Sequence, residues 1–175
     1  MILVLEANAR KHLAVGTVRV IESSGASSNT IPGWASFTID IRHPSDEVID
    51  SIMKEVNREM HSISKENPRF SFRLEQVWES LAATFDKIML DYLRNAAQEE
   101  VGLRSILDII SFAGHDSAMT TLKVPTAMLF VPCRNRISHS PVEFTTKAQC
   151  RDRVQILLNA ILKYDTWLVA RHTKM

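Results

Sequence analysis

A change in the spacing of apolar residues constrains this chain most, because it divides the sequence into two blocks with different architectures. Residues 34–43 alternate strictly between apolar and polar side chains, and the polar set includes Asp40 and Arg42. Successive side chains of a strand point to opposite faces, so the alternation predicts a strand with one buried face and Arg42 on the other face. The apolar set is Ala35, Phe37, Ile39 and Ile41.

The first block, residues 1–79, has the pattern of a two-layer α+β domain. The elements it predicts are a short helix over residues 1–12, a strand over 16–22, a turn-rich loop over 23–33, the strand above, a helix from the N-cap Ser45 to about Lys65, and a third alternating strand over 69–79. This order suits an antiparallel sheet with both helices on one face. It lacks a first strand, so we expect the domain to be partial.

The second block, residues 80–175, has the pattern of a mainly parallel α/β domain. Its two continuous apolar runs are typical of strands covered on both faces. The elements it predicts are a helix over 85–101 stopped by Gly102, a strand over 105–112, a helix over 115–122, a strand over 126–131, and a helix from about Thr145 to Ala170. The last helix repeats apolar residues at Val154, Leu157, Leu158, Ile161, Leu162 and Leu168.

Composition excludes several classes of function. The net charge is +1, with 21 basic and 20 acidic residues, so the chain lacks the field that nucleic acid or acidic lipid binding requires. Its 5 glycines are not clustered as in phosphate-binding loops. Two cysteines suit a reducing compartment, and no apolar run approaches the roughly 18 residues of a membrane span. We therefore expect a soluble cytoplasmic protein.

Polar residues gather after the two predicted buried strands, where open α/β sheets place ligand sites. Residues 111–117 (SFAGHDS) enter a helix, so their backbone N–H groups are placed to face an anion or an oxyanion. His139, in the segment SHSP, is placed to offer an imidazole to a metal. A loop histidine is more often a hydrogen-bonded surface residue, and Asp116 and Ser117 suit local capping of the helix. Spacing alone leaves both interpretations open.

Three segments in order resemble one enzyme family. They are GTVRVIESSGASSNTIPGWASFTIDIRHPSDEVI, SFAGHDSA and VPCRNRISHSPVEFT. They are similar to the lid signature, the Gly-His-Asp-Ala turn and the closing Ser-His-Ser/Asn-Pro-x-Glu motif of zinc-dependent amidohydrolases in the aminoacylase and carboxypeptidase metallopeptidase superfamily. The branch is that of N-carbamoyl-amino-acid hydrolases, β-ureidopropionase and allantoate amidohydrolase.

The resemblance implies roles for five residues. His139 is implied as a ligand of a two-ion centre that holds zinc or another divalent metal such as manganese. Asn29 and Arg42 are implied to hold the substrate carboxylate, a task that suits a guanidinium fork and an amide donor. Gly114 and His115 are implied to lie beside the substrate. No residue is assigned proton transfer.

The resemblance also implies a domain organisation. Residues 1–79 correspond to part of a lid, or dimerisation, domain, and residues 80–175 to the C-terminal part of a metal-dependent catalytic domain. In the family, two metals activate a bridging water and a glutamate relays its proton. The remaining ligands, that glutamate and a lid histidine precede the segments present here. Arg136 stands where the family usually has glycine, and Ser117 where it has alanine.

Three functions remain open. The first is a metal-dependent hydrolase of linear amides, acting on small carboxylate-bearing N-carbamoyl or ureido substrates and assembling as a homodimer. The second is a truncated, non-catalytic binding or dimerisation module. The third is an aminoacylase or peptidase of the same superfamily. For Arg42, a surface ion pair with Asp40 or Asp46 is the structural alternative to substrate binding.

Overall fold

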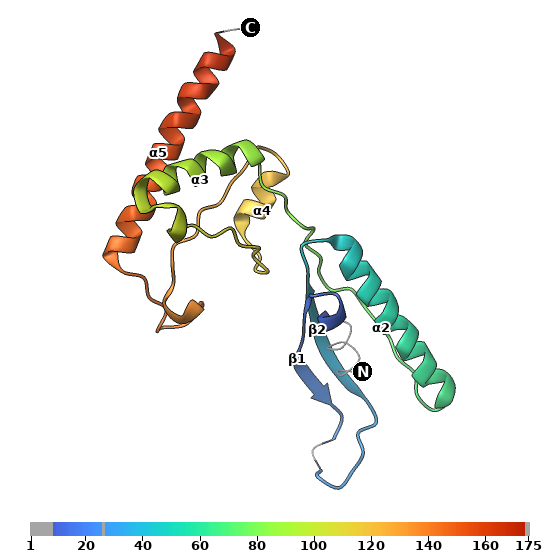
Figure 1. Ribbon diagram of the computed structural model, residues 1–175. Coiled ribbons are helices and arrows are strands. Elements are labelled where there is room, and N and C mark those ends of the chain that lie inside the picture. The colour runs from blue at the N-terminus through green and yellow to red at the C-terminus, as the bar shows by residue number, and fades with distance from the viewer. Residues whose placement is uncertain (1–8, 26, 174–175) are drawn as a thin grey trace. The chain divides into compact units, whose positions relative to one another are not determined.

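The computed structural model describes residues 9–25 and 27–173 (Figure 1). Their contacts form two units, one that runs to Ala82 and includes Ile110–Gly114, and one that contains Ala83–Ile109 and the residues from His115 onward. The elements are β1 (Val15–Ser23), β2 (Ala35–Arg42), α2 (Asp46–Glu66), α3 (Lys87–Val101), the 3-10 helix η1 (Leu103–Ser105), α4 (Asp116–Thr121), the 3-10 helix η2 (Arg134–Arg136) and α5 (Lys147–His172). The mixed α/β class is as predicted.

The first unit is built on an antiparallel hairpin of β1 and β2. Val15 pairs with Arg42 and Val18 with Ile39, and the register shifts between Val18 and Ile21. Both strands were predicted from alternation, and they are confirmed. Most of the predicted helix over residues 1–12 lies outside the described residues, although residues 9–11 are helical.

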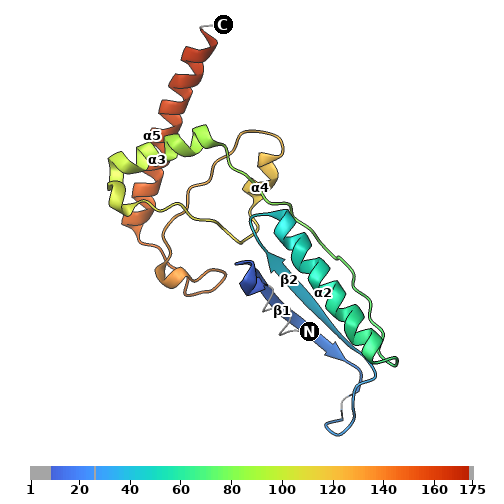
Figure 2. The same cartoon turned by 45° about the vertical axis from the view of Figure 1, so that its right-hand side comes forward.

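Helix α2 covers the apolar face of this hairpin (Figure 2). Ile52 and Val56 are fully buried, and Val18, Ile39 and Ile41 pack against them. The alternation therefore identified the inner face of β2 correctly. Ser45 precedes the helix as predicted, but its side chain makes no capping hydrogen bond.

Residues 69–79 are not a strand, so this prediction was wrong. The segment returns alongside α2 instead, as both views show. The ring of Phe72 meets His61 edge to face at a centroid distance of 4.9 Å, and the Ala82 N–H donates to Asp46 Oδ1 at 2.9 Å. A strand requires a neighbour for its backbone groups, and no described strand pairs with this segment. Alternation alone therefore does not make this segment a strand, and Phe70 and Leu74 are exposed.

The second unit is centred on the contact between α3 and α5. Ala96 and Ala97 of α3 are buried against Ile156 and Ala160 of α5. Three alanines at the contact allow the two helix axes to approach closely. Both helices were predicted, and they are confirmed.

Local capping explains where these helices begin and end. The Asp86 side chain accepts from the Met89 N–H at 2.9 Å, and Thr146 forms a reciprocal capping box with Gln149. Gly102 follows α3 with φ 77° and ψ 152°, a conformation that only glycine adopts readily. The predicted stop at Gly102 is therefore confirmed.

The two predicted strands of the parallel sheet do not form. Residues 105–112 and 126–131 have no sheet partner, and the described residues contain only the two-stranded sheet of β1 and β2. Leu107 and Ile110 are 82% and 65% exposed. A continuous apolar run indicates burial between layers, but it becomes a strand only where neighbouring strands accept its hydrogen bonds. Among the described residues, none of the helices is long and apolar enough to cross a membrane.

Candidate functional site

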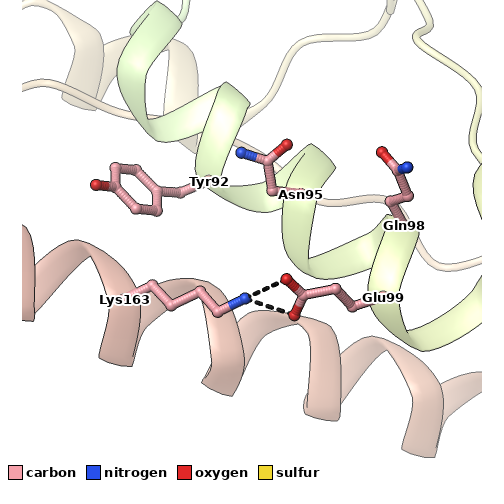
Figure 3. A pocket seen from close by; sticks show the side chains of 5 residues that line it. All are labelled: Tyr92, Asn95, Gln98, Glu99 and Lys163. Carbon is pink, nitrogen blue, oxygen red and sulfur yellow. Dashed lines mark hydrogen bonds and ion pairs between the residues drawn. The ribbon is translucent and has the colours of Figure 1, made fainter.

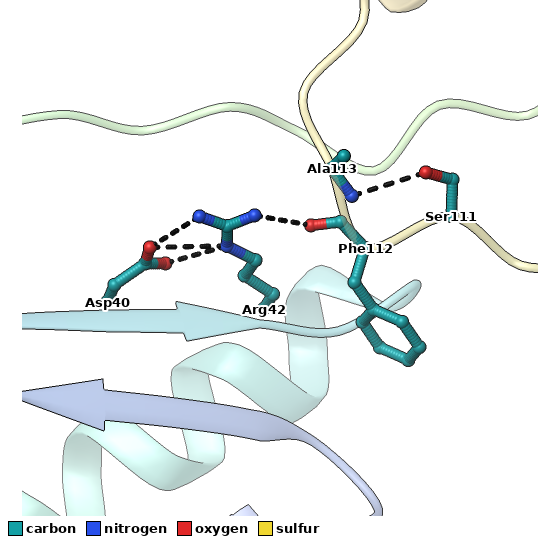
Figure 4. Close-up of polar contacts among 5 residues, drawn as sticks. All are labelled: Asp40, Arg42, Ser111, Phe112 and Ala113. Atoms are coloured by element: carbon teal, nitrogen blue, oxygen red, sulfur yellow. Dashed lines mark hydrogen bonds and ion pairs between the residues drawn. The ribbon is translucent and has the colours of Figure 1, made fainter. Parts of the chain in front are cut away.

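Arg42 ends β2 and is held by two acceptors of its own unit (Figure 4). Its Nε donates to Asp40 Oδ1 at 3.0 Å and Oδ2 at 3.2 Å, and its Nη2 donates to Oδ2 at 2.6 Å. Its Nη1 donates to the Phe112 carbonyl at 3.0 Å. Residues two apart in a strand share a face, which explains why Asp40 reaches Arg42. The structure thus joins Arg42 to the turn that contains Gly114.

These contacts bear on the two readings of Arg42. The ion pair with Asp40 exists, whereas Asp46 accepts from a backbone N–H instead. The contacts use three of the five N–H groups of the guanidinium and leave one on each terminal nitrogen. The side chain is 41% exposed, so an anion can reach it. Hydrogen bonding to Asp40 raises the pKa of Arg42, which keeps the fork charged.

We expect Asp40 to make stability depend on pH in acid. The hydrogen bond from Arg42 lowers the pKa of Asp40 below its ordinary value of 3.8. A lowered pKa stabilises the folded state above the ordinary value, and this stabilisation disappears as the pH falls through the lowered value. Urea unfolding between about pH 2 and 5 should therefore show a shallower loss of stability in Asp40→Asn than in the wild type. Parallel curves would contradict the pairing.

Asn29 lies in the exposed loop between β1 and β2. Its Oδ1 accepts from the hydroxyl of Ser27 and from Thr30 Oγ1 at 3.5 Å. The loop is closed by Ser24, whose Oγ accepts from the Gly33 N–H at 2.8 Å. With its oxygen engaged locally, Asn29 retains its amide N–H groups as donors, which are what a carboxylate needs.

The Gly114-His115 turn leads into α4. His115 is the residue before the helix, and its ring meets Phe130 edge to face at a centroid distance of 5.5 Å. A Cβ added to Gly114 would meet nothing within 4 Å. Ser117 does not cap the helix, since its hydroxyl donates to the Met128 sulfur at 3.2 Å. Local capping is therefore the wrong explanation for Ser117.

His139 lies in a bend of the second unit with a left-handed backbone, φ 55°. Its N–H donates to Glu143 Oε2 at 3.0 Å, and the side chain is exposed. The bend is closed where the Arg134 N–H donates to the Phe144 carbonyl at 2.8 Å. Non-glycine residues in this conformation are strained and concentrate at functional sites. His139 shares this conformation with Leu13, Asn135 and Arg136 among the described residues, so the backbone alone does not set it apart.

The described residues do not make a metal centre by themselves. Among residues 9–25 and 27–173, no three His, Cys, Asp or Glu side chains gather where they could hold an ion. A catalytic zinc needs about three protein ligands. The thiol of Cys133, the nearest sulfur in sequence to His139, instead donates to the Ile137 carbonyl at 2.8 Å. His139 is one ligand at most.

Arg136 also has a left-handed backbone, φ 57°, at the position where the related motif has glycine. For a residue with a Cβ this conformation costs about 1–2 kcal/mol. Glycine avoids this cost, but part of the gain in stability is lost because glycine makes the unfolded chain more flexible. We expect Arg136→Gly to raise the free energy of unfolding by about 0.5–1 kcal/mol in urea denaturation. Arg136→Ala, which removes the charge but keeps the Cβ, should change it little. If both variants changed the free energy of unfolding equally, the arginine side chain and not the left-handed backbone would be the source of the strain.

A polar groove of about 490 Å³ lies between α3 and α5 (Figure 3). Lys163 reaches across it from α5 to form an ion pair with Glu99. Isolated polar residues on a helix surface form no motif, so this groove was not predictable from the sequence. None of the predicted site residues lines it. Its lining residues are Tyr92, Asn95, Gln98, Glu99 and Lys163.

Curated relatives support the resemblance. The chain is 31% identical to the N-carbamoyl-L-amino-acid amidohydrolase of Rhizobium meliloti over 86% of its length, and 30% identical to the allantoate amidohydrolase of Bacillus subtilis over 78%. It is 27% identical to the ureidoglycolate hydrolase of Arabidopsis thaliana over 85%. It covers 35%, 32% and 31% of these proteins, so it spans about a third of their length.

Solved structures agree with these relatives. An amidase of the hydantoinase/carbamoylase family from Burkholderia multivorans matches 92% of the chain with a TM-score of 0.79 and 30% identity, and the match covers 40% of that amidase. A similar amidase from Burkholderia vietnamiensis matches 92% with a TM-score of 0.76. The predicted fold class is confirmed by this likeness. A family model for peptidase family M20/M25/M40 matches residues 4–163, and the chain therefore belongs to that family.

Proposed function

We propose that this chain supplies the carboxylate-recognition part of a hydrolase that cleaves C–N bonds in linear N-carbamoyl or ureido amides. The observation that carries the proposal is the Arg42 guanidinium, which is fixed by Asp40 and the Phe112 carbonyl with an N–H group remaining on each terminal nitrogen. Planar paired donors suit a carboxylate. The names of the relatives, which specify carbamoyl amino acids, allantoate and ureidoglycolate, support this substrate class. Asn29 and the Gly114-His115 turn complete the proposed contacts.

We further propose that His139 donates its imidazole to a divalent metal, zinc or manganese, in a two-ion centre. The exposed ring on a strained bend supports this role. No three candidate ligands gather among the described residues, so in this proposal the chain contributes one metal ligand and the orientation of the substrate.

Binding of matched small molecules tests the proposal. The 175-residue chain, labelled with ¹⁵N, would be titrated with N-carbamoyl-L-alanine and with N-carbamoyl-L-alaninamide, which lacks the carboxylate. We expect the acid alone to shift the Arg42 signals. Equal shifts with both compounds, or none with the acid, would contradict carboxylate recognition.

Ammonia release distinguishes the hydrolase from a binding module. We expect negligible release from N-carbamoyl-L-alanine or allantoate by the 175-residue chain alone, because a two-ion centre needs more ligands than the described residues bring together. Robust metal-dependent release would contradict that expectation. Preferential binding of N-acetyl-L-alanine would favour an aminoacylase or peptidase instead.

We also propose that the first unit forms a homodimer. Each strand of the two-stranded sheet of β1 and β2 has an unpaired edge among the described residues, and Val20 and Ile21 are 54% and 62% exposed. Unpaired edges with apolar side chains favour association. A monomer in light scattering at micromolar concentration would contradict dimerisation.

The two free cysteines agree with a reducing, cytoplasmic location.

A further inference from the structure

The contacts around Arg42 distinguish two edges of its guanidinium. Asp40 occupies the side edge, formed by Nε and Nη2. The Phe112 carbonyl takes one N–H of Nη1 (Figure 4). One N–H group remains on each terminal nitrogen, and a carboxylate has two oxygens that can accept from such a pair.

The strand makes this arrangement rigid. Asp40 and Arg42 lie on one face of β2, while Ile39 and Ile41 on the other face pack against the buried core under α2. Arginine side chains otherwise sample many rotamers, and that freedom is lost when a ligand is bound. Holding the guanidinium beforehand removes this loss from the binding step.

We propose that Asp40 is a positioning residue, which fixes the side edge of Arg42 so that the terminal N–H groups present a paired donor to the substrate carboxylate. The inference rests on the proposed function and deepens it. Asp40 does not touch the substrate in this arrangement, and it acts through Arg42 alone.

Charge and position make opposite predictions for Asp40. Asp40 is negative and would repel a carboxylate, so an effect of charge alone predicts that Asp40→Asn tightens binding. Positioning predicts the reverse, because an amide offers one neutral acceptor where the carboxylate offers two charged ones. The sign of the change therefore separates the two explanations.

The experiment measures both the guanidinium and its ligand. In the ¹⁵N-labelled full chain, the Arg42 Nε–H signal is assigned by its absence in Arg42→Lys, and its exchange with water is measured before N-carbamoyl-L-alanine is titrated. We expect Asp40→Asn to accelerate exchange about tenfold and to weaken binding about fivefold or more. Glu22→Gln, which makes the same charge change on β1, should alter neither quantity.

Each outcome decides something different. Unchanged exchange in Asp40→Asn, or unchanged or tighter binding, would overturn the positioning role. If the wild type bound no better than Arg42→Ala, carboxylate recognition would fail, and the exchange rates would still decide whether Asp40 holds Arg42. Should Asp40→Asn not fold, Asp40→Glu carries the test at constant charge, with binding expected to weaken about twofold and unchanged binding overturning the role.

Discussion

Replacing Ile156 with alanine is expected to lower the free energy of unfolding of the second unit by about 2–5 kcal/mol. Ile156 is fully buried in α5 and packs against Ala96, Ala97 and Ala160. Alanines cannot extend into the space that a deleted side chain leaves, so the cavity persists and adds to the lost burial. Urea denaturation followed by the helical circular dichroism signal measures the change.

Ile161→Ala is the matched control in the same helix. Ile161 is 55% exposed, so the same deletion removes little buried surface, and alanine is the better helix former. We expect a change within about 0.5 kcal/mol. Equal losses for the two variants would mean that both faces of α5 are covered, which would contradict the packing described for α3 and α5.

Helix boundaries were predictable because their causes are local. Asp86, Gly102 and Thr146 act within one turn of the residues they cap, so a short stretch of sequence contains the whole signal. The start of α2 shows the limit of this reasoning. Ser45 occupies the expected position but makes no capping bond. The residue type makes a capping hydrogen bond possible, but the side-chain rotamer determines whether it forms.

Strands were less predictable because a strand depends on distant residues. Residues 34–43 and 69–79 share the same alternation, yet only the first finds a partner, β1, and becomes a strand. The apolar runs at 105–112 and 126–131 likewise carry the composition of buried strands without a described neighbour to pair with. The pattern of apolar residues predicts which face of a segment is apolar. Whether the segment becomes a strand depends on a neighbouring strand, which can be distant in the sequence.

Helix α5 has apolar residues on two sides, and most of the repeated apolar residues named from the sequence are exposed and do not belong to the side that packs against α3. The repeated large residues, such as Val154 and Ile161, are 67% and 55% exposed, whereas Ile156 and Ala160 face α3. At 100° per residue these two sets lie on opposite sides of the helix. Helix α3 packs against the side of α5 that includes the small residue Ala160. Composition alone would predict burial of the other side, which has the larger apolar residues.

The candidate site was predictable only in part. Asp40 was foreseeable as a partner of Arg42, because the two residues share a strand face. The Phe112 carbonyl was not foreseeable, since a backbone acceptor 70 residues away leaves no trace in side-chain pattern. The left-handed backbone of Arg136 was signalled indirectly, by glycine at the same place in the related motif.

Arg42→Ala is expected to weaken binding of N-carbamoyl-L-alanine by about 10- to 150-fold, the equivalent of losing a charged hydrogen-bonded contact of about 1.5–3 kcal/mol. The variant also leaves the Asp40 carboxylate without its arginine, so a second anion meets an uncompensated negative charge. Titration calorimetry or ¹⁵N chemical shifts of the full chain measure the loss.

Arg42→Lys tests whether shape or charge binds the carboxylate. Lysine restores the positive charge but not the planar pair of donors, and its ammonium is drawn to Asp40, so we expect it to recover less than a tenth of the wild-type affinity. Arg73→Lys is the control, because Arg73 belongs to the same unit and its side chain is 86% exposed. Wild-type affinity in Arg42→Lys would mean that a point charge suffices. Recognition would then depend on the net charge of the first unit, and the fixed orientation of the guanidinium would have no part in it.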